Sequence, residues 1–244
     1  MYYVTWSEGF RPGLLNRPVG SGNDTYRVKA EVISDEITNM EFGWKTILLD
    51  GQLRFNGSMF SVDVEGLQST ILDPAMNVNL FFSDNAANGT IRGMEGDFTY
   101  LTNYDGLSIA GAYSFLSSEI TEKLLPTNDV VEGAEMAFAP GYQGNVRVRQ
   151  EFGMSNGYVG HAQVQLVYSD GATSDIMEPN KAKQNSYSYL DLRVGMSSDD
   201  MTAELYIDNV TDKRAEISNN FVFDRQRVTV IKPMTVGIRV KKNF

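Results

Sequence analysis

The sequence lacks cysteine, has a single histidine, and carries 21 Lys and Arg against 31 Asp and Glu, for a formal net charge of -10 over 244 residues. Without cysteine the chain cannot form disulfides, thiolate metal sites or a cysteine nucleophile. A single histidine argues against centres built from several histidines. Because no basic block offsets the acidic balance, we expect no nucleic-acid partner.

Long apolar runs are also missing. No stretch of about 18 apolar residues occurs, so no transmembrane helix is expected. The hydrophobic fraction of 42% is still compatible with a membrane protein whose apolar residues alternate with polar ones. The N-terminal residues MYYVTWSEGF lack the basic start, apolar core and cleavage site of a signal peptide. We therefore expect either that the protein is not exported or that Met1 is not its natural beginning.

The strongest pattern in the sequence is a period of two. Near the C-terminus, apolar residues alternate with polar ones at Met234, Val236, Ile238, Val240 and Phe244, which predicts a strand with one apolar and one polar face. Nine further segments alternate in the same way, at residues 2–7, 39–48, 53–59, 94–100, 107–115, 146–152, 161–168, 190–197 and 202–208. The sequence therefore predicts about ten strands, no helix and no domain boundary.

The connections between these segments alternate in length. Short turns are predicted at Asp50-Gly51, Tyr104-Asp105-Gly106, Ser155-Asn156-Gly157 and Ser198-Asp199-Asp200. Long polar connections are predicted at about 11–35, 67–88, 119–135, 171–186 and 212–227. This alternation places every short turn at one end of the sheet and every long loop at the other. Outer-membrane barrels have the same layout, with short periplasmic turns and longer extracellular loops.

The sequence thus predicts an all-β fold, an antiparallel transmembrane β-barrel with about ten strands in this chain. Aromatic residues near predicted strand ends, such as Trp6 and Tyr100, are typical of the girdles at membrane interfaces. A soluble β-sandwich also has alternating strands, but it requires neither charges in mid-strand nor aromatic strand ends. A soluble all-β binding protein remains a third alternative.

Five segments carry longer motifs, in order along the chain. They are YVTWSEGFRPGLLNRP (3–18), MEFGWK followed by DGQLR (40–45 and 50–54), NGTIRGME (88–95), LYIDNVTDKR (205–214) and the stretch from KPMTVGI to the end (232–244). Together they resemble the C-terminal barrel of TonB-dependent outer-membrane receptors. The fourth segment is the most specific and resembles the penultimate strand. The third departs from the usual small-residue pattern at Gly89 and Thr90.

This resemblance implies that residues 1–244 are the C-terminal portion of a barrel of about 22 strands, with the plug domain, the TonB box and the signal peptide absent from the sequence. It implies a receptor in the outer membrane of a Gram-negative bacterium that takes up a scarce nutrient, most often a ferric siderophore or another iron complex, without a cofactor. The implied partners are TonB through the missing plug, the barrel-assembly machinery, outer-membrane lipid, lipopolysaccharide and the iron chelate. The terminal Phe244 is expected to be the assembly signal, or alternatively one more lipid-facing aromatic residue.

Six residues are candidate ligand contacts: Arg11, Asn16, Arg17 and Tyr26 in the first long loop, and Phe81 and Phe82 near the second. Arginine suits an anionic chelate because it forms bidentate hydrogen bonds, whereas the alternative for each residue is ordinary solvated loop chemistry.

The polar strand faces carry charges of both signs. Their expected role is mutual pairing that keeps the barrel wall hydrated and holds the plug, and the alternative is that they line a transport path or form the surface that contacts the plug. These charges are Glu41, Lys45, Arg54, Glu95, Asp97, Arg147, Arg149, Glu151, Arg193, Glu204, Asp208, Arg239 and Lys241.

Catalysis and metal binding are not expected. His161 follows the predicted turn at 155–157, on the lumenal face near the periplasmic end, and no serine or aspartate motif accompanies it. The Asp- and Asn-rich stretches at 83–85, 170–175 and 198–200 lack the ligand spacing of a calcium loop. A second function class remains open: a self-contained ten-stranded barrel acting as a passive pore or adhesin, which an even strand number permits.

Overall fold

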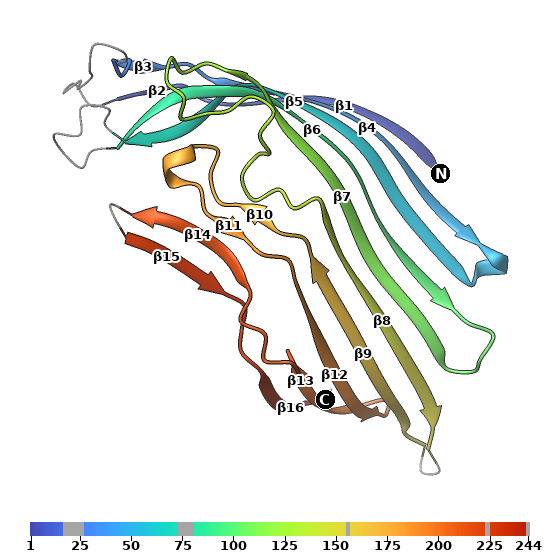
Figure 1. The fold of residues 1–244 in the computed structure, drawn as a ribbon. Helices are drawn as coiled ribbons and strands as arrows, with labels where there is room; N and C mark the ends of the chain where they lie inside the picture. The colour runs from blue at the N-terminus through green and yellow to red at the C-terminus, as the bar shows by residue number, and fades with distance from the viewer. Residues whose placement is uncertain (17–26, 73–80, 155–156, 223–224, 243–244) are drawn as a thin grey trace.

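The computed structural model describes residues 1–16, 27–72, 81–154, 157–222 and 225–242. Ten strands form one antiparallel sheet in which each strand pairs with the next one along the sheet (Figure 1): β1 (Tyr2–Arg11), β4 (Asp35–Leu48), β5 (Leu53–Leu72), β6 (Phe81–Leu101), β7 (Leu107–Lys123), β8 (Tyr142–Gly153), β9 (Val159–Ser169), β12 (Tyr187–Ser197), β13 (Met201–Asp208) and β16 (Thr235–Lys242). The predicted all-β antiparallel fold is confirmed. Within the described residues the edge strands β1 and β16 do not pair with each other, so the sheet is a curved, open wall.

The connections alternate in length as predicted. At one end lie short links, among them η1 (Leu49–Gly51), residues 102–106 and residues 198–200, while the turn predicted at Ser155-Asn156-Gly157 lies partly outside the described residues. At the other end the long links contain β2 (Leu14–Leu15) paired with β3 (Glu31–Val32), β10 (Ala172–Thr173) paired with β11 (Lys183–Gln184), β14 (Glu216–Val222) paired with β15 (Arg225–Val230), and η2 (Glu178–Asn180). In the part of the chain that the structure describes, no helix is long and apolar enough to cross a membrane.

The long connection predicted at 67–88 is wrong over most of its length, because β5 and β6 continue through it as paired strands. The cause is a bulge between Val64 and Leu67. Gly66, inside the bulge, has a positive φ of 65°, and its carbonyl accepts a hydrogen bond from Asn85 Nδ2 at 2.5 Å. A bulge adds a residue to one strand and shifts the alternation of its side chains, so the sequence beyond it no longer shows a continuous period of two.

One face of the sheet is apolar and rich in aromatic rings. The strand register places Tyr2, Trp44 and Tyr113 in one row across the sheet. Tyr2 stacks on Phe42 with ring centroids 6.2 Å apart, and further ring contacts continue as far as β9. At Gly57 an added Cβ would lie 2.5 Å from the Trp44 ring, so only glycine fits beneath it. A whole face of exposed apolar side chains indicates contact with lipid.

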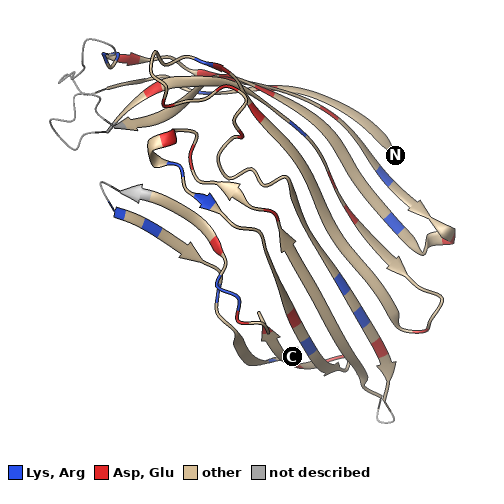
Figure 2. Ribbon diagram, in the orientation of Figure 1, with Lys and Arg blue, Asp and Glu red and all other residues tan. Residues whose placement is uncertain are grey.

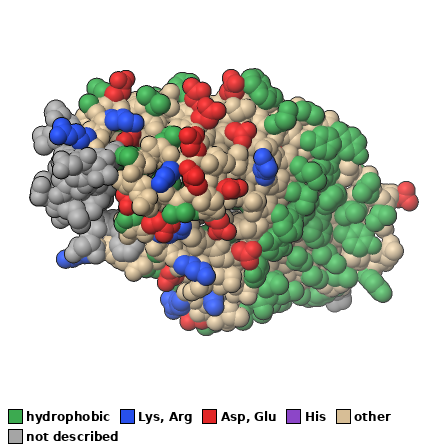
Figure 3. Space-filling view, turned by 45° about the horizontal axis from the view of Figure 1, so that its top comes forward, with side chains coloured by type: hydrophobic (Ala, Val, Ile, Leu, Met, Phe, Trp, Pro, Cys, Tyr) green, Lys and Arg blue, Asp and Glu red, His purple; other side chains and the backbone are tan. Residues whose placement is uncertain are grey.

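Toward the long loops the same face becomes acidic. Glu8, Asp63 and Glu119 share one row of the register, and Glu36 lies directly opposite Glu65 on the neighbouring strand. Figure 3 shows hydrophobic side chains gathered in one broad area of that view, beside an area in which acidic side chains are frequent. The change from apolar to charged side chains marks the height at which lipid gives way to water.

The opposite face, on the concave side of the sheet, is polar along the parts of the strands nearer the short turns and apolar at the end with the long loops. The buried apolar cluster consists of Val64, Ile71, Phe82, Ala86, Ala87, Ile120, Leu125, Val130, Met136, Ile176 and Met177. It forms where the connection after β7 folds back over the strands (Figure 1). The core of the chain therefore lies inside the curve, beneath the long loops.

Candidate functional site

Arg11, the first predicted ligand contact, is held by a buried carboxylate. Its guanidinium forms an ion pair with Asp35, which is 2% exposed, and its Nε lies 2.9 Å from Asp35 Oδ2. Its backbone N–H donates to Asp35 Oδ1 at 3.0 Å, and its Nη2 donates to the carbonyl of Gln68 at 3.1 Å. Arg11 therefore ties β1 to β4 and β5, and much of its charge is already compensated. Its contact with a ligand stays a prediction.

Asn16 and Phe82 also have structural partners. Asn16 Nδ2 donates to the carbonyls of Lys29 and Ser83 at 2.8 Å each, and the N–H of Ser83 donates back to Asn16 Oδ1 at 3.0 Å. Phe82 is 2% exposed and belongs to the buried cluster. Arg17, Tyr26 and Phe244 lie outside the described residues, as does the side chain of Phe81. For all of these residues the predicted roles remain predictions.

The densest group of lumenal charges surrounds Glu204 on β13. Its Oε1 lies 3.3 Å from Arg193 Nη1 and 3.3 Å from Arg239 Nη1. Arg193 also reaches Asp208, with 3.2 Å between Nη2 and Oδ1. Both guanidinium groups lie over the ring of Tyr206, at 5.9 and 5.5 Å from its centroid. The group links three neighbouring strands by charge-assisted hydrogen bonds and cation–π contacts.

His161 completes this group. Its Nε2 lies 3.2 Å from Glu204 Oε2, and its Nδ1 has no hydrogen-bond partner among the described residues. The ring is only 3% exposed, which leaves no room for a substrate to approach. A histidine and a carboxylate without a nucleophile cannot carry out covalent catalysis, so the geometry supports a packing role.

Other lumenal charges also pair as predicted. Arg54 lies 3.4 Å from Asp97, and Arg149 lies 2.8 Å from Glu151. Figure 2 shows charged positions of both signs along the strands of the sheet. These pairs are partly exposed, so each contributes at most about 1 kcal/mol to stability. Their main effect is to keep the concave face polar and hydrated.

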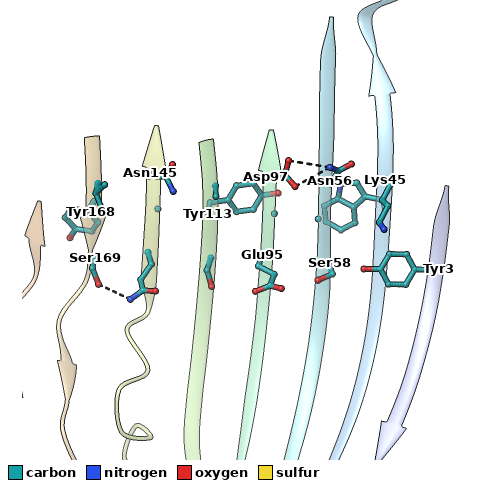
Figure 4. Close-up of a pocket in the computed structure, with 18 of the residues that line it drawn as sticks. Tyr3, Lys45, Asn56, Ser58, Glu95, Asp97, Tyr113, Asn145, Tyr168 and Ser169 are labelled. Carbon is teal, nitrogen blue, oxygen red and sulfur yellow. Dashed lines mark hydrogen bonds between the residues drawn. The ribbon is translucent and has the colours of Figure 1, made fainter. Parts of the chain in front are cut away.

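A polar groove of about 630 Å³ runs along the concave face at mid-height (Figure 4). Tyr3 Oη donates to Glu41 Oε1 at 2.7 Å at one side of the groove, and Asn56 Nδ2 donates to Asp97 Oδ1 at 3.2 Å nearer its centre. Glu95 projects from the same strand as Asp97. Among the described residues, no group of three or more His, Asp or Glu side chains is placed to hold a metal ion. The groove is suited to water and to polar partners.

A second, apolar recess of about 700 Å³ lies nearer the long loops. Strands β4 to β7 form one wall, and residues 136–139 and 174–176 form the other. Among the described residues that line it, the one ionisable group is Asp175, which accepts the N–H of Met177 at 3.0 Å. Burial raises the pKa of the Asp175 carboxyl above its usual value, and backbone hydrogen bonds only partly oppose this.

Sequence reasoning missed both the Arg11–Asp35 pair and the loop wall of the recess. Nothing in the sequence pairs Arg11 with Asp35, because the two lie 24 positions apart with a predicted loop between them. Residues 134–141, read as AEMAFAPG, did leave a signal, since several apolar residues sit in or beside a stretch expected to be a polar connection. An apolar segment in a loop indicates that the loop packs against something.

Comparison with known proteins agrees with this geometry. A sequence model of the family described as TonB dependent receptor-like, beta-barrel, matches residues 1–210. The ferric yersiniabactin uptake receptor FyuA from Yersinia pestis superposes with a TM-score of 0.74 at 19% identity, over 100% of this chain and 35% of that one. The ferric preacinetobactin receptor BauA from Acinetobacter baumannii gives a TM-score of 0.72 at 17% identity, over 100% and 34%. The siderophore receptor PiuA from the same organism gives a TM-score of 0.68 at 17% identity, over 98% of this chain and 33% of that one.

At these identities the solved structures show a shared fold, and the chain spans about a third of the length of these receptors. The family match is independent of them and covers most of the chain. The known members of this family are receptors and transporters rather than enzymes. The curved antiparallel wall, its lipid-facing aromatic side and the family match agree that this chain belongs to the TonB-dependent receptor β-barrel family, whose members lie in the outer membrane of Gram-negative bacteria.

Proposed function

We propose that the chain is the C-terminal part of the barrel wall of a receptor that takes up a ferric siderophore or another iron complex with energy supplied through TonB. The observation that carries the proposal is the superposition of the whole curved sheet on receptors named for such ligands, at TM-scores of 0.74 and 0.72. The fold alone does not define a ligand, so the proposal is the transport class and not a named chelate.

The contribution of this chain to uptake follows from its two faces. The aromatic face holds the wall in lipid, and the polar concave face borders a hydrated path. We expect the long loops and the upper concave face to meet the ligand. The plug and the TonB box would come from the remainder of the receptor, and no bond of the ligand needs to break.

The assembly and membrane partners are part of the same proposal. On the last strand, Val236, Ile238 and Val240 are 59%, 76% and 65% exposed, as expected for a lipid-facing edge near an assembly signal. Phe244 would be read by the barrel-assembly machinery, and lipopolysaccharide would surround the loop end. Deleting Phe244 should lower the amount of receptor in outer-membrane fractions, whereas unchanged amounts would remove the assembly role.

The curvature of the sheet disfavours the passive pore or adhesin. A barrel's diameter grows with its strand number, so ten strands closing on themselves need a much tighter curve than a wall segment of a large barrel. This sheet follows the wall of receptors about three times its length, with 100% of the chain covered. That agreement supports the receptor over a closed ten-stranded barrel.

The size of the native polypeptide tests the proposal first. An antibody against the C-terminal segment should detect a band well above 27.2 kDa in outer membranes, and the band should shift when the sample is heated. A heat-shifting band at 27.2 kDa would instead indicate a complete small barrel. Uptake of radioactive iron from a panel of ferric chelates should then stop when TonB is deleted. Uptake that persists without TonB would exclude energy-coupled transport.

A further inference from the structure

The β14–β15 hairpin continues the last two strands of the wall toward the long-loop end. The chain runs from β13 into β14 and returns through β15 into β16, so the hairpin lies beyond the paired strands β13 and β16 (Figure 1). β14 lies against β11 on one side and pairs with β15 on the other. β15 is therefore the outer strand of the hairpin, as β16 is the outer strand of the wall, and its outer edge continues that of β16.

Hydrogen bonds across its base hold the hairpin in place. Asn209 is 3% exposed, and its Nδ2 donates to the carbonyls of Lys213 and Lys232 at 2.9 and 2.8 Å. The N–H of Ile231 donates to the carbonyl of Ala215 at 2.9 Å. Both sets of bonds join the chain that leaves β13 to the chain that enters β16. The position of β15 above β16 is therefore fixed by the fold.

The outer edge of β15 is open. Among the described residues β15 pairs with β14 alone, and all six of its residues are exposed, whereas Asn219 on β14 is 2% exposed. In an antiparallel strand the N–H and C=O groups of every second residue point to the same side. Half of the backbone groups of β15 therefore face outward, and such an edge is a template for a further strand.

The membrane part of the wall shows which strand approaches this edge. Backbone groups at an open edge have no hydrogen-bond partner in lipid, so the outer edge of β16 must pair with a strand from the remainder of the receptor. If the chain is the C-terminal part of the barrel, that partner is the first barrel strand. β16 runs from the long-loop end to the short-turn end, so its antiparallel partner rises toward the long loops. The residues that follow the first barrel strand then arrive beside β15.

The side chains of β15 indicate the chemistry of this segment. Arg225 and Arg227 share one face of the strand, and neither has a hydrogen-bond or ion-pair partner among the described residues. Val228 and Val230 share the other face and are 44% and 42% exposed. Opposite charges and apolar side chains stabilise a sheet when they lie directly across from each other on neighbouring strands. A second copy of β15 would add arginines to the arginine face, whereas a strand of alternating acidic and apolar residues matches both faces.

We propose that β15 binds the segment that follows the first barrel strand, as an added antiparallel strand with alternating acidic and apolar residues. The inference rests on the proposed function and goes beyond it, because closure of the barrel within the membrane does not require pairing above it. The seam between the last and first strands would thus stay closed through the β14–β15 hairpin.

Photo-crosslinking of the full-length receptor in outer membranes identifies the segment. A benzophenone amino acid placed at Val228 should join β15 to the residues that follow the first barrel strand, as found by mass spectrometry of the crosslinked peptides. Ile217 is the matched control position, because it is 45% exposed and lies on β14, the inner strand of the same hairpin. The same amino acid at Ile217 should give several times less of that crosslink.

Amide hydrogen exchange of the unaltered receptor in detergent provides a test without any variant. If β15 is paired on both sides, all of its N–H groups should exchange slowly, whereas an open edge leaves every second one to exchange freely. Arg227→Glu should speed exchange of the outward N–H groups about fivefold, the factor that exchanging an exposed ion pair for a like-charge contact implies. Arg227→Lys keeps the charge and should change the rate less than twofold.

The outcomes separate this inference from the proposed function. Free exchange of every second N–H of β15 would overturn the inference, as would a crosslink to another receptor segment, to lipopolysaccharide or to a second receptor, while uptake of ferric chelates would still stand. Equal exchange rates in Arg227→Glu and Arg227→Lys would overturn the acidic partner. If the native polypeptide is a complete barrel of 27.2 kDa, the proposed function fails together with the inference.

Discussion

Replacing Glu204 should weaken the C-terminal part of the wall more than any other single change to the lumenal charges. Its carboxylate receives Arg193 from β12, Arg239 from β16 and the ring of His161 from β9. One residue on β13 therefore connects four strands. The variant Glu204→Ala removes the acceptor and leaves two guanidinium groups and a buried imidazole without it.

The size of the effect follows from the exposure of each partner. Truncating one member of a buried ion pair destabilises a protein by about 3–5 kcal/mol, while exposed pairs contribute about 0–1 kcal/mol. The side chain of Arg239 is 63% exposed, so its pair belongs to the second class. Arg193 is 24% exposed, so its pair lies nearer the first, and the ring of His161, which is 3% exposed, would lose its hydrogen-bond partner. We expect Glu204→Ala to lower the free energy of unfolding by about 2–3 kcal/mol, after a discount for the water that reaches Arg193.

Urea unfolding of the full-length receptor in detergent, followed by tryptophan fluorescence, measures this loss. Glu204→Gln keeps one carbonyl acceptor and should lose about 1 kcal/mol. Arg54→Ala is the control, because the Arg54–Asp97 pair is 60% and 46% exposed and should contribute less than about 1 kcal/mol. If Glu204→Ala and Arg54→Ala destabilise the receptor equally, burial does not set the strength of these pairs and the reasoning is refuted.

Three further predictions concern packing and pH. Gly57→Val should destabilise the wall by about 1–3 kcal/mol in the same assay, because its side chain would collide with the Trp44 ring; an unchanged midpoint would mean that the ring moves aside freely. Burial raises the pKa of the Asp175 carboxyl. The protonated carboxyl therefore contributes stability at low pH, and this contribution is lost as the pH rises through the raised pKa. Asp175→Asn should remove that loss in melting curves recorded from pH 3 to 7. The N–H of Met234 donates to Asp212 Oδ1 at 2.8 Å, and this hydrogen bond lowers the pKa of the Asp212 carboxyl. The ionised carboxylate therefore contributes stability above the usual pKa of aspartate, and this contribution is lost as the pH falls through the lowered pKa. Asp212→Asn should abolish that acid-side loss, and an unchanged acid profile would contradict it.

The strands were predictable because lipid and water enforce a period of two. Each spanning residue faces either the bilayer or the lumen, so the pattern survives in the sequence wherever a strand is regular. The aromatic row through Trp44 and Tyr113 and the charged row through Glu204 and Arg239 both appear as alternation. Prediction failed at 67–88, where the bulge beside Gly66 shifts the phase and two paired strands read as a loop.

The candidate site was predictable only in part, because loop residues obey no period. Arg11 was chosen for its charge, but the charge of a single residue says nothing about a partner that folding brings to it. Asp35 is such a partner, buried to 2% exposure, and it occupies the guanidinium that was expected to meet a ligand. Phe82 likewise has partners that its sequence context does not reveal, since its ring lies in the buried cluster, and its contact with a ligand stays a prediction.

The exposure of Phe138, in the connection after β7, leaves no pattern in the sequence. Its N–H donates to the carbonyl of Thr173 and its ring is 48% exposed, whereas Met136 nearby in the sequence is 8% exposed and belongs to the buried cluster. Which of these two side chains is exposed depends on contacts with residues far along the chain, and the sequence does not reveal such contacts. Arg11 shows the same limit, because its carboxylate partner Asp35 lies on the adjacent strand and the two are separated in the sequence by a predicted loop.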